Sequence, residues 1–275
     1  MTYKTILTHV QPDAEAVLRL QSAVDVAGDF GAHLIGLGAE ALPPLGFADP
    51  YGFAQGDMIV AMRSAIEVNA AAAEAAFRAK AGRLSNEWRI SQDIPTQAMA
   101  RAARAADLIV AGGAPRGTID IYRIVDTGEL AVNAGRPVLV APPTGGRLQA
   151  KGVVLAWKDT REARRALSDS MPFLKRAERV TVLGATLETD TTAVEFQVND
   201  VAAALARHGV PAKAKVVTPK HEEDICGEIF NEAVSIDADL VVAGAYGHSR
   251  LQEWVLGGVT RDLLNMADRF VLLSH

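Results

Sequence analysis

The chain reads DLIVAG at 107–112 and DLVVAG at 239–244, and these two stretches decide its fold. Each is an apolar run without polar alternation, which predicts a strand buried on both faces of a parallel sheet. A further apolar run follows each copy at almost the same distance, 30 residues on from Leu108 at Val138 and 31 residues on from Leu240 at Val271. A repeat of this length indicates a duplicated domain, because solenoid repeats are much shorter.

The rest of the chain repeats one alternation of strands and helices around these runs. The second half is predicted to have strands at 153–156, 180–185, 212–217, 240–243 and 270–273, and helices at 161–174, 194–205, 222–233 and 260–266. Five such units predict a parallel sheet with helices on both faces. Two prolines and two glycines at 142–147 indicate a linker. We therefore expect two domains, at 1–146 and 147–275.

Composition restricts the class of protein. Of 275 residues, 49% are hydrophobic but only 5% are aromatic, which excludes disorder and indicates an aliphatic core. The single cysteine, Cys226, excludes a disulfide framework and a cysteine-based zinc cluster, and is expected in the core. A net charge of −5 argues against nucleic acid or an anionic membrane as partner. Because no signal-peptide pattern and no apolar run of about 18 residues is present, we expect a cytoplasmic protein.

Glycines gather where the strand at 240–243 ends. Gly244 and Gly247 follow this strand, and Gly257 and Gly258 precede the last predicted helix. Glycine lets backbone amides approach a phosphate closely, and the start of a helix favours an anion. Thr260 could cap this helix or donate its hydroxyl to phosphate. The alternative is that these glycines only form tight turns.

The spacing G-x2-G-x9-G after a DLVVAG strand resembles the universal stress protein (UspA-like) family, and the resemblance covers nearly all of both halves. It implies an α/β fold of two doubly wound, five-stranded domains of the adenine nucleotide α-hydrolase-like type. The two domains would be related by a pseudo-twofold axis and paired through their last strands, around 138–140 and 271–273. It also implies a stress-response protein that binds ATP or a related nucleotide in its second half, with Mg2+ brought by the nucleotide.

Two positions depart from the family pattern. The Ser or Thr expected after the third glycine is Gly258, which keeps a backbone amide but lacks a hydroxyl. The Asp expected at the end of the first strand is replaced by Lys158, with Asp159 one residue later. Lys158 either neutralises phosphate or lies in solvent, and Trp157 packs either on a base or in the core. Gly184 or Ala185 would line the adenine slot.

The sequence thus predicts a nucleotide site in the second half and no catalytic or metal-binding residues. The predicted nucleotide-binding residues are Ala156, Trp157, Lys158, Asp159, Ala185, Gly244, Gly247, His248, Gly257, Gly258, Val259 and Thr260. His248 and the neighbouring Arg250 either touch phosphate or lie in solvent. Because no motif for an activated nucleophile is present, slow ATP hydrolysis is the most chemistry we expect.

The first half has lost the glycine pattern. Alignment of the last strands sets Ile124 and Val125 opposite Gly257 and Gly258, and Pro115 opposite Gly247. Branched side chains would fill the space that phosphate needs, and proline removes a donor. We expect this half not to bind nucleotide in the family manner. The Pro- and Gly-rich loop at 41–57, which precedes a long helix at 58–84, is either a lid or a ligand or partner contact.

A second class of function fits the same sequence. If both glycine sites are degenerate, the protein is a regulatory scaffold or interaction protein that binds no nucleotide. An ATP-pyrophosphatase-type enzyme ranks third, because the segment 156–160 lacks the S-G-G-x-D-S-like loop that such an enzyme uses. The sequence does not determine whether two chains form a homodimer.

Overall fold

The computed structural model of the chain describes residues 2–11, 14–44, 53–113, 120–245, 258–265 and 268–275. The first half contains β1 (Thr5–His9), α1 (Ala14–Phe30), β2 (His33–Ala39), α2 (Phe53–Ala81), β3 (Asn86–Ser91), α3 (Pro95–Ala102), the short turn η1 (Ala103–Ala105), β4 (Leu108–Gly112), α4 (Thr127–Asn133) and β5 (Val138–Ala141). The second half contains β6 (Gly152–Trp157), α5 (Arg161–Leu174), β7 (Arg179–Ala185), α6 (Thr192–Arg207), β8 (Lys213–Val217), the short turn η2 (Glu222–Asp224), α7 (Ile225–Ser235), β9 (Leu240–Gly244), α8 (Gly258–Leu264) and β10 (Phe270–Ser274).

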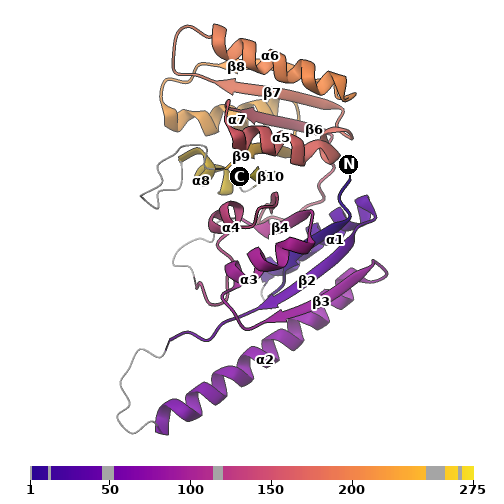
Figure 1. The fold of residues 1–275 in the computed structure, drawn as a ribbon, viewed down its shortest axis with the longest axis vertical. Coiled ribbons are helices and arrows are strands. Elements are labelled where there is room, and N and C mark those ends of the chain that lie inside the picture. The colour runs from indigo at the N-terminus through magenta and orange to yellow at the C-terminus, as the bar shows by residue number, and fades with distance from the viewer. Residues whose placement is uncertain (1, 12–13, 45–52, 114–119, 246–257, 266–267) are drawn as a thin grey trace.

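The ten described strands form one sheet, in the order β3-β2-β1-β4-β5-β10-β9-β6-β7-β8. Strands within each half run parallel, and the halves meet where β5 pairs antiparallel with β10. At this junction Leu139 lies opposite Leu272, and both are buried. The predicted pairing through the last strands is confirmed. The two halves have the same internal strand order, and Figure 1 shows them stacked along the long axis of the molecule.

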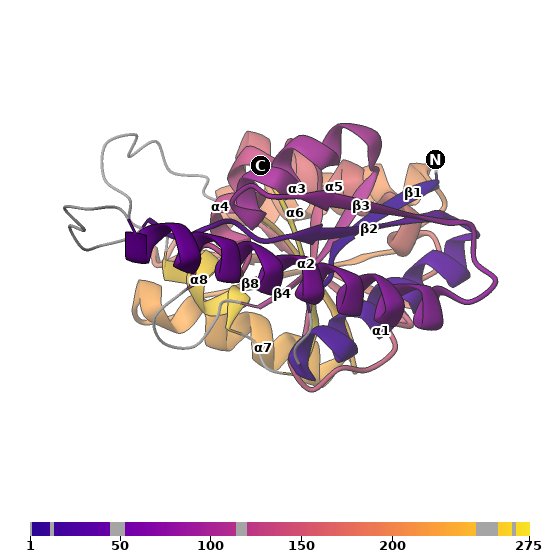
Figure 2. The ribbon, with the colours of Figure 1, turned by 90° about the horizontal axis from the view of Figure 1, so that it is seen from below.

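Side chains that alternate along the strands enter two hydrophobic cores, one on each face of the sheet. Ile6 and Val153 point into the first core, which α1, α2, α5 and α6 cover. Their neighbours Leu7 and Val154 point into the second core, which α3, α4, α7 and α8 cover. Helices accordingly lie on both sides of the sheet (Figure 2). Each core contains residues of both halves, so the halves share their hydrophobic interior.

The aspartate that opens each repeated strand motif has a structural role. Oδ2 of Asp107 accepts hydrogen bonds from two amides at the start of β1, at 2.8 and 3.0 Å. Oδ2 of Asp239 accepts hydrogen bonds from two amides just before β6, at 2.7 and 3.0 Å. In each half a carboxylate therefore ties the fourth strand to the chain entering the first strand, and hydrogen bonds to a charged acceptor are the strong ones.

The predicted helix limits differ from the structure at four places, and the smallest difference is at α6, which extends the helix predicted at 194–205 by two residues at each end. The last helix starts at Gly258 instead of residue 260. A glycine is tolerated at this start because the first amides of a helix have no partner within the helix. The helix predicted at 222–233 divides into η2 and α7, and the amide of His221 is bonded to the Asp224 carboxylate at 3.1 Å. The helix predicted at 58–84 is α2, which starts at Phe53 and runs along the edge of the sheet past β3 (Figure 1). Residues 45–52 of the preceding loop, and Met266, lie outside the described residues.

An aromatic cluster joins the two halves next to α1 and α5. The rings of Tyr3, Phe30 and Phe173 contact one another, with centroids 5.0, 5.3 and 5.3 Å apart. The Tyr3 hydroxyl donates to the carbonyl of Asp169 at 2.6 Å, and the Arg176 guanidinium lies over the Phe30 ring, 3.8 Å from its centroid. Burial raises the pKa of Tyr3 far above its ordinary value, with the charge of Asp169 adding to the effect, so the hydroxyl stays protonated and donates.

We predict that Phe173→Ala lowers the free energy of unfolding by ~3–5 kcal/mol, because it removes a buried ring shared by both halves. Phe196→Ala is the matched control: Phe196 is 73% exposed on α6, so its loss should change stability by less than ~0.5 kcal/mol. Urea unfolding of the two variants measures the difference. Equal losses would contradict a stabilising role for the cluster.

Candidate functional site

The strand order of the second half places a switch point between β6 and β9. From β6 the chain adds β7 and β8 on one side, then returns to add β9 on the other side of β6. In doubly wound sheets, ligands bind beyond the carboxyl ends of the strands that flank such a reversal. Ala156 and Trp157 end β6, Gly244 ends β9, and Ala185 ends the adjacent β7. The structure therefore brings four of the predicted residues to neighbouring strand ends.

Gly244 and Gly258 lack a side chain for different reasons. A Cβ atom on Gly244 would lie 2.6 Å from the amide nitrogen of Ala163 and 2.7 Å from the carbonyl carbon of Glu162, so the first turn of α5 requires a glycine there. A Cβ atom on Gly258 would meet no atom of a described residue within 4 Å. Gly244 is thus needed for packing, whereas none of the described residues fills the space beside the Gly258 backbone, where a phosphate could approach.

Side chains at the end of β6 lie in different environments. Trp157 is buried in the first core, and its Nε1 atom has no hydrogen-bond partner among the described residues. A buried donor without a partner is costly, and a ligand acceptor would satisfy it. Lys158 and Asp159 are exposed, and the Asp159 carboxylate pairs with Arg164 at 2.5 Å. The core packing predicted as one alternative for Trp157 is therefore observed.

Glu162 is a buried acid at this edge that the sequence analysis missed. It lies in the first turn of α5 against Gly244, and its carboxylate pairs with Arg161. Burial, the largest effect, would raise the pKa of Glu162, but hydrogen bonds from Arg161, its own backbone and Thr160 together outweigh burial and hold the pKa below its usual range. Its position after the N-capping Thr160 was the available signal, since acids favour a helix start.

The remaining predicted residues divide into two groups. Val259 and Thr260 lie in the first turn of α8, where Thr260 is buried. Three others lie outside the described residues, namely Gly247, His248 and Gly257, and so does the neighbouring Arg250. The predicted nucleotide site therefore remains a prediction, supported at its strand ends and at the start of α8.

The corresponding segment of the first half is occupied by its own side chains. Asp126 caps α4, and its Oδ1 atom accepts the amide of Glu129 at 2.9 Å. The Thr127 hydroxyl donates to the carbonyl of Gly112 at 2.8 Å. A carboxylate and a carbonyl thus take the donors that a phosphate would need, which favours the prediction that this half binds no nucleotide in that manner. Pro115 lies outside the described residues.

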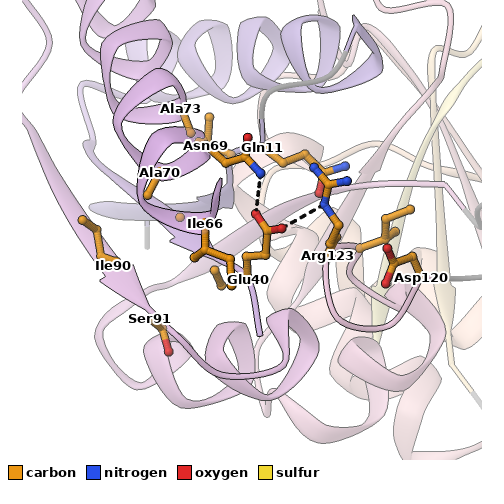
Figure 3. A pocket seen from close by; sticks show the side chains of 14 residues that line it. Gln11, Glu40, Ile66, Asn69, Ala70, Ala73, Ile90, Ser91, Asp120 and Arg123 are labelled. Carbon is orange, nitrogen blue, oxygen red and sulfur yellow. Dashed lines mark hydrogen bonds and ion pairs between the residues drawn. The ribbon is translucent and has the colours of Figure 1, made fainter. Parts of the chain in front are cut away.

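The structure also contains a cavity of about 200 Å³ in the first half, at the carboxyl ends of β1, β2 and β3 and beside α2. Figure 3 shows Glu40 between Asn69 and Arg123 in its wall. Asn69 Nδ2 donates to Glu40 Oε2 at 3.0 Å, and Arg123 Nε lies 3.0 Å from Glu40 Oε1. These three residues come from the end of β2, from α2 and from the segment before α4, so no sequence motif connects them.

The cavity corresponds in position to the predicted site of the second half. The register of β1 on β4 matches that of β6 on β9, so Val10 corresponds to Trp157. By the same comparison of β2 with β7, Ala39 corresponds to Ala185, and both Val10 and Ala39 line the cavity. Val10 leaves room that an indole would take. The internal alignment of the two first strands was the signal that could have located this cavity.

Two further properties bear on chemistry. Within the described residues, no group of three or more His, Cys, Asp or Glu side chains is placed to hold a metal ion. None of the described helices has both the length and the apolar character needed to cross a membrane. Cys226 is half-buried in α7, and burial raises its pKa to about 11, with the charge of Asp262 adding to the effect.

Comparison with known proteins identifies what the second half resembles. Residues 155–275 match the model of the Universal stress protein family. A universal stress protein from Archaeoglobus fulgidus DSM 4304 has a similar structure, with a TM-score of 0.64 and 16% sequence identity, covering 98% of this chain and 95% of that chain. A protein of unknown function from Pseudomonas aeruginosa PAO1 has a TM-score of 0.57 and 18% sequence identity, and the match covers 99% of this chain and 92% of that chain. No curated protein matches the sequence. The two-domain fold is therefore shared over the whole chain.

We predict that the Cys226 thiol reacts slowly in the folded protein. With its pKa at about 11 instead of 9.0, the thiolate fraction at pH 8 falls ~100-fold, and the thiolate is the reactive form. Because the folded pKa is raised, the stability that this thiol contributes is complete below pH 9 and is lost as the pH rises through about 11. Iodoacetamide labelling at pH 8 of native and urea-unfolded chain measures the ratio. Equal rates would contradict the prediction.

Proposed function

We propose that this chain, whose residues 155–275 form a universal stress protein domain, binds ATP or a related adenine nucleotide through that domain as a cytoplasmic stress-response protein. The observation that carries the proposal is the open backbone at Gly258, at the start of α8 and in the half of the chain that matches the family. A branched side chain there would take the space that a phosphate needs, and no described residue takes it.

Several described residues of the site have a part in the proposed binding. The first amides of α8 would donate to phosphate oxygens, and Lys158, just after β6, would supply a compensating positive charge. Ala185, at the end of β7, would lie beside the base. Mg2+ would enter bound to the phosphates, because its usual sites keep several waters and few protein ligands.

The proposal is one of binding without efficient catalysis. Cys226 is not an activated nucleophile, since its pKa is raised. Glu162, a buried acid at the edge of the site, is already paired with Arg161. A protein of this kind would respond to the nucleotide through its conformation or its partners, and any turnover of bound ATP would be slow.

We predict that ATP with Mg2+ raises the melting temperature of the full chain and that Gly258→Val removes the effect. At an ATP concentration about 100 times Kd, binding adds ~2.7 kcal/mol. For a chain of this size that corresponds to a rise of roughly 5–10 °C. Differential scanning fluorimetry measures the shift, and equilibrium dialysis measures the ATP bound.

The matched control is Gly56→Val, which places the same side chain in equally open space on α2 of the first half. It should keep the full ATP shift. A missing shift in the unmodified chain at millimolar ATP would contradict the proposal and favour the scaffold alternative. A shift that survives Gly258→Val would place the phosphates elsewhere.

A further inference from the structure

We propose that the cavity of the first half binds a small organic cation, a protonated amine on an apolar body, and no phosphorylated ligand. The cavity lies at the carboxyl ends of β1–β3, in the half where the phosphate-binding pattern is lost. The inference does not rest on nucleotide binding by the second half, and the two are tested with different ligands and different variants.

The size of the cavity limits the ligand. Its volume is about 200 Å³. An apolar cavity of about 150 Å³ in another protein holds a benzene molecule. There is therefore room for one ring with a short chain. A second cavity of about 180 Å³, lined in part by Arg63, shares Ile66 in its wall.

One wall of the cavity is apolar. Ile66, Ala70 and Ala73 of α2 line it together with Ile90 of β3. Figure 3 shows Ile66, Ala70 and Ile90 on one side of Glu40, with Arg123 and Asp120 on the other. Pockets for small ligands combine apolar walls with a few polar groups that fix orientation. The apolar wall would hold the ring, and the opposite side would hold the polar end.

Glu40 is the group placed to recognise a cation. Its side chain is 18% exposed. Among the described residues, Oε1 forms an ion pair with Arg123 Nε at 3.0 Å, and Oε2 accepts a hydrogen bond from Asn69 Nδ2 at 3.0 Å. A carboxylate offers about four acceptor positions, so it can take further donors. An ammonium donor would form a charge-assisted hydrogen bond with it, which is stronger than a neutral one.

The charges around the cavity disfavour an anion. Glu40 and Asp120 are acidic and Arg123 is the one basic side chain among the described lining residues, so the lining carries one net negative charge. Arg123 already pairs with Glu40. Like charges brought together cost binding energy, so a phosphate is rejected.

The test uses two probes of similar shape and opposite charge, 2-phenylethylamine and phenylacetate, titrated into the full chain by calorimetry at low ionic strength. We expect the amine to bind ~10-fold or more tightly than the carboxylate. Equal binding of the two probes, tighter binding of phenylacetate, or binding of neither would overturn the proposal.

Two substitutions on α2 locate the binding. Ala70→Leu fills the cavity and should weaken binding of the amine ~10-fold or more. Ala71→Leu makes the same change on the neighbouring, exposed position and should leave binding unchanged. An equal effect of both substitutions would place the amine outside the cavity.

A third substitution tests the role of Glu40. Glu40→Gln removes the charge and keeps the shape of the side chain. It should therefore lower the affinity for the amine ~10-fold and leave the affinity for phenylacetate unchanged or higher. Equal loss of both probes would contradict the role of Glu40 in charge selection. If the Glu40→Gln chain melts early, Asp120→Asn at an exposed position tests the same charge preference, and an unchanged ratio of the two affinities would overturn it.

Discussion

The antiparallel pairing of β5 with β10 is the constraint on which the rest of the molecule depends. Each of these strands would be an open edge of its own five-stranded sheet, with unpaired backbone groups on buried apolar strands. Their pairing makes one sheet and extends both hydrophobic cores across the junction. It also holds α1 against α5. In addition, it brings α8 so close to Gly113 that a Cβ atom there would lie 2.7 Å from the carbonyl oxygen of Leu264, so this position requires glycine.

A duplicated fold gives the protein two equivalent positions at which to bind a ligand. The carboxyl ends of β1 and β2 correspond to those of β6 and β7, but the residues there differ. Val10 leaves space where Trp157 fills it. Asp126 occupies the start of α4, whereas no described residue occupies the corresponding space at Gly258. Two copies of one scaffold can therefore take ligands of opposite charge, because the fold sets where a ligand lies and the side chains set what it is.

The sequence predicted most of the fold because its signals are local and repeated. The strand ends predicted for the second half lie within a residue or two of those observed. The signals were the two DL-x-VAG strands, the linker at 142–147 and the apolar runs. The cavity could not be predicted from the sequence, because its polar residues Glu40, Asn69 and Arg123 are distant in the chain and meet only through tertiary packing. Gly244 shows a further limit: its spacing indicated a phosphate contact, whereas the close approach of α5 already requires it. The spacing of glycines cannot separate these two causes.

The central claim is that the two halves, equal in fold, differ in what they bind, with nucleotide on the second half alone. Hydrogen exchange of the full chain with and without ATP and Mg2+, read by mass spectrometry, tests it most directly. The account predicts slower exchange in peptides covering 156–160 and 258–265, and unchanged exchange in peptides covering 9–11 and 38–42. Protection of the first-half peptides, with none in the second half, would contradict it.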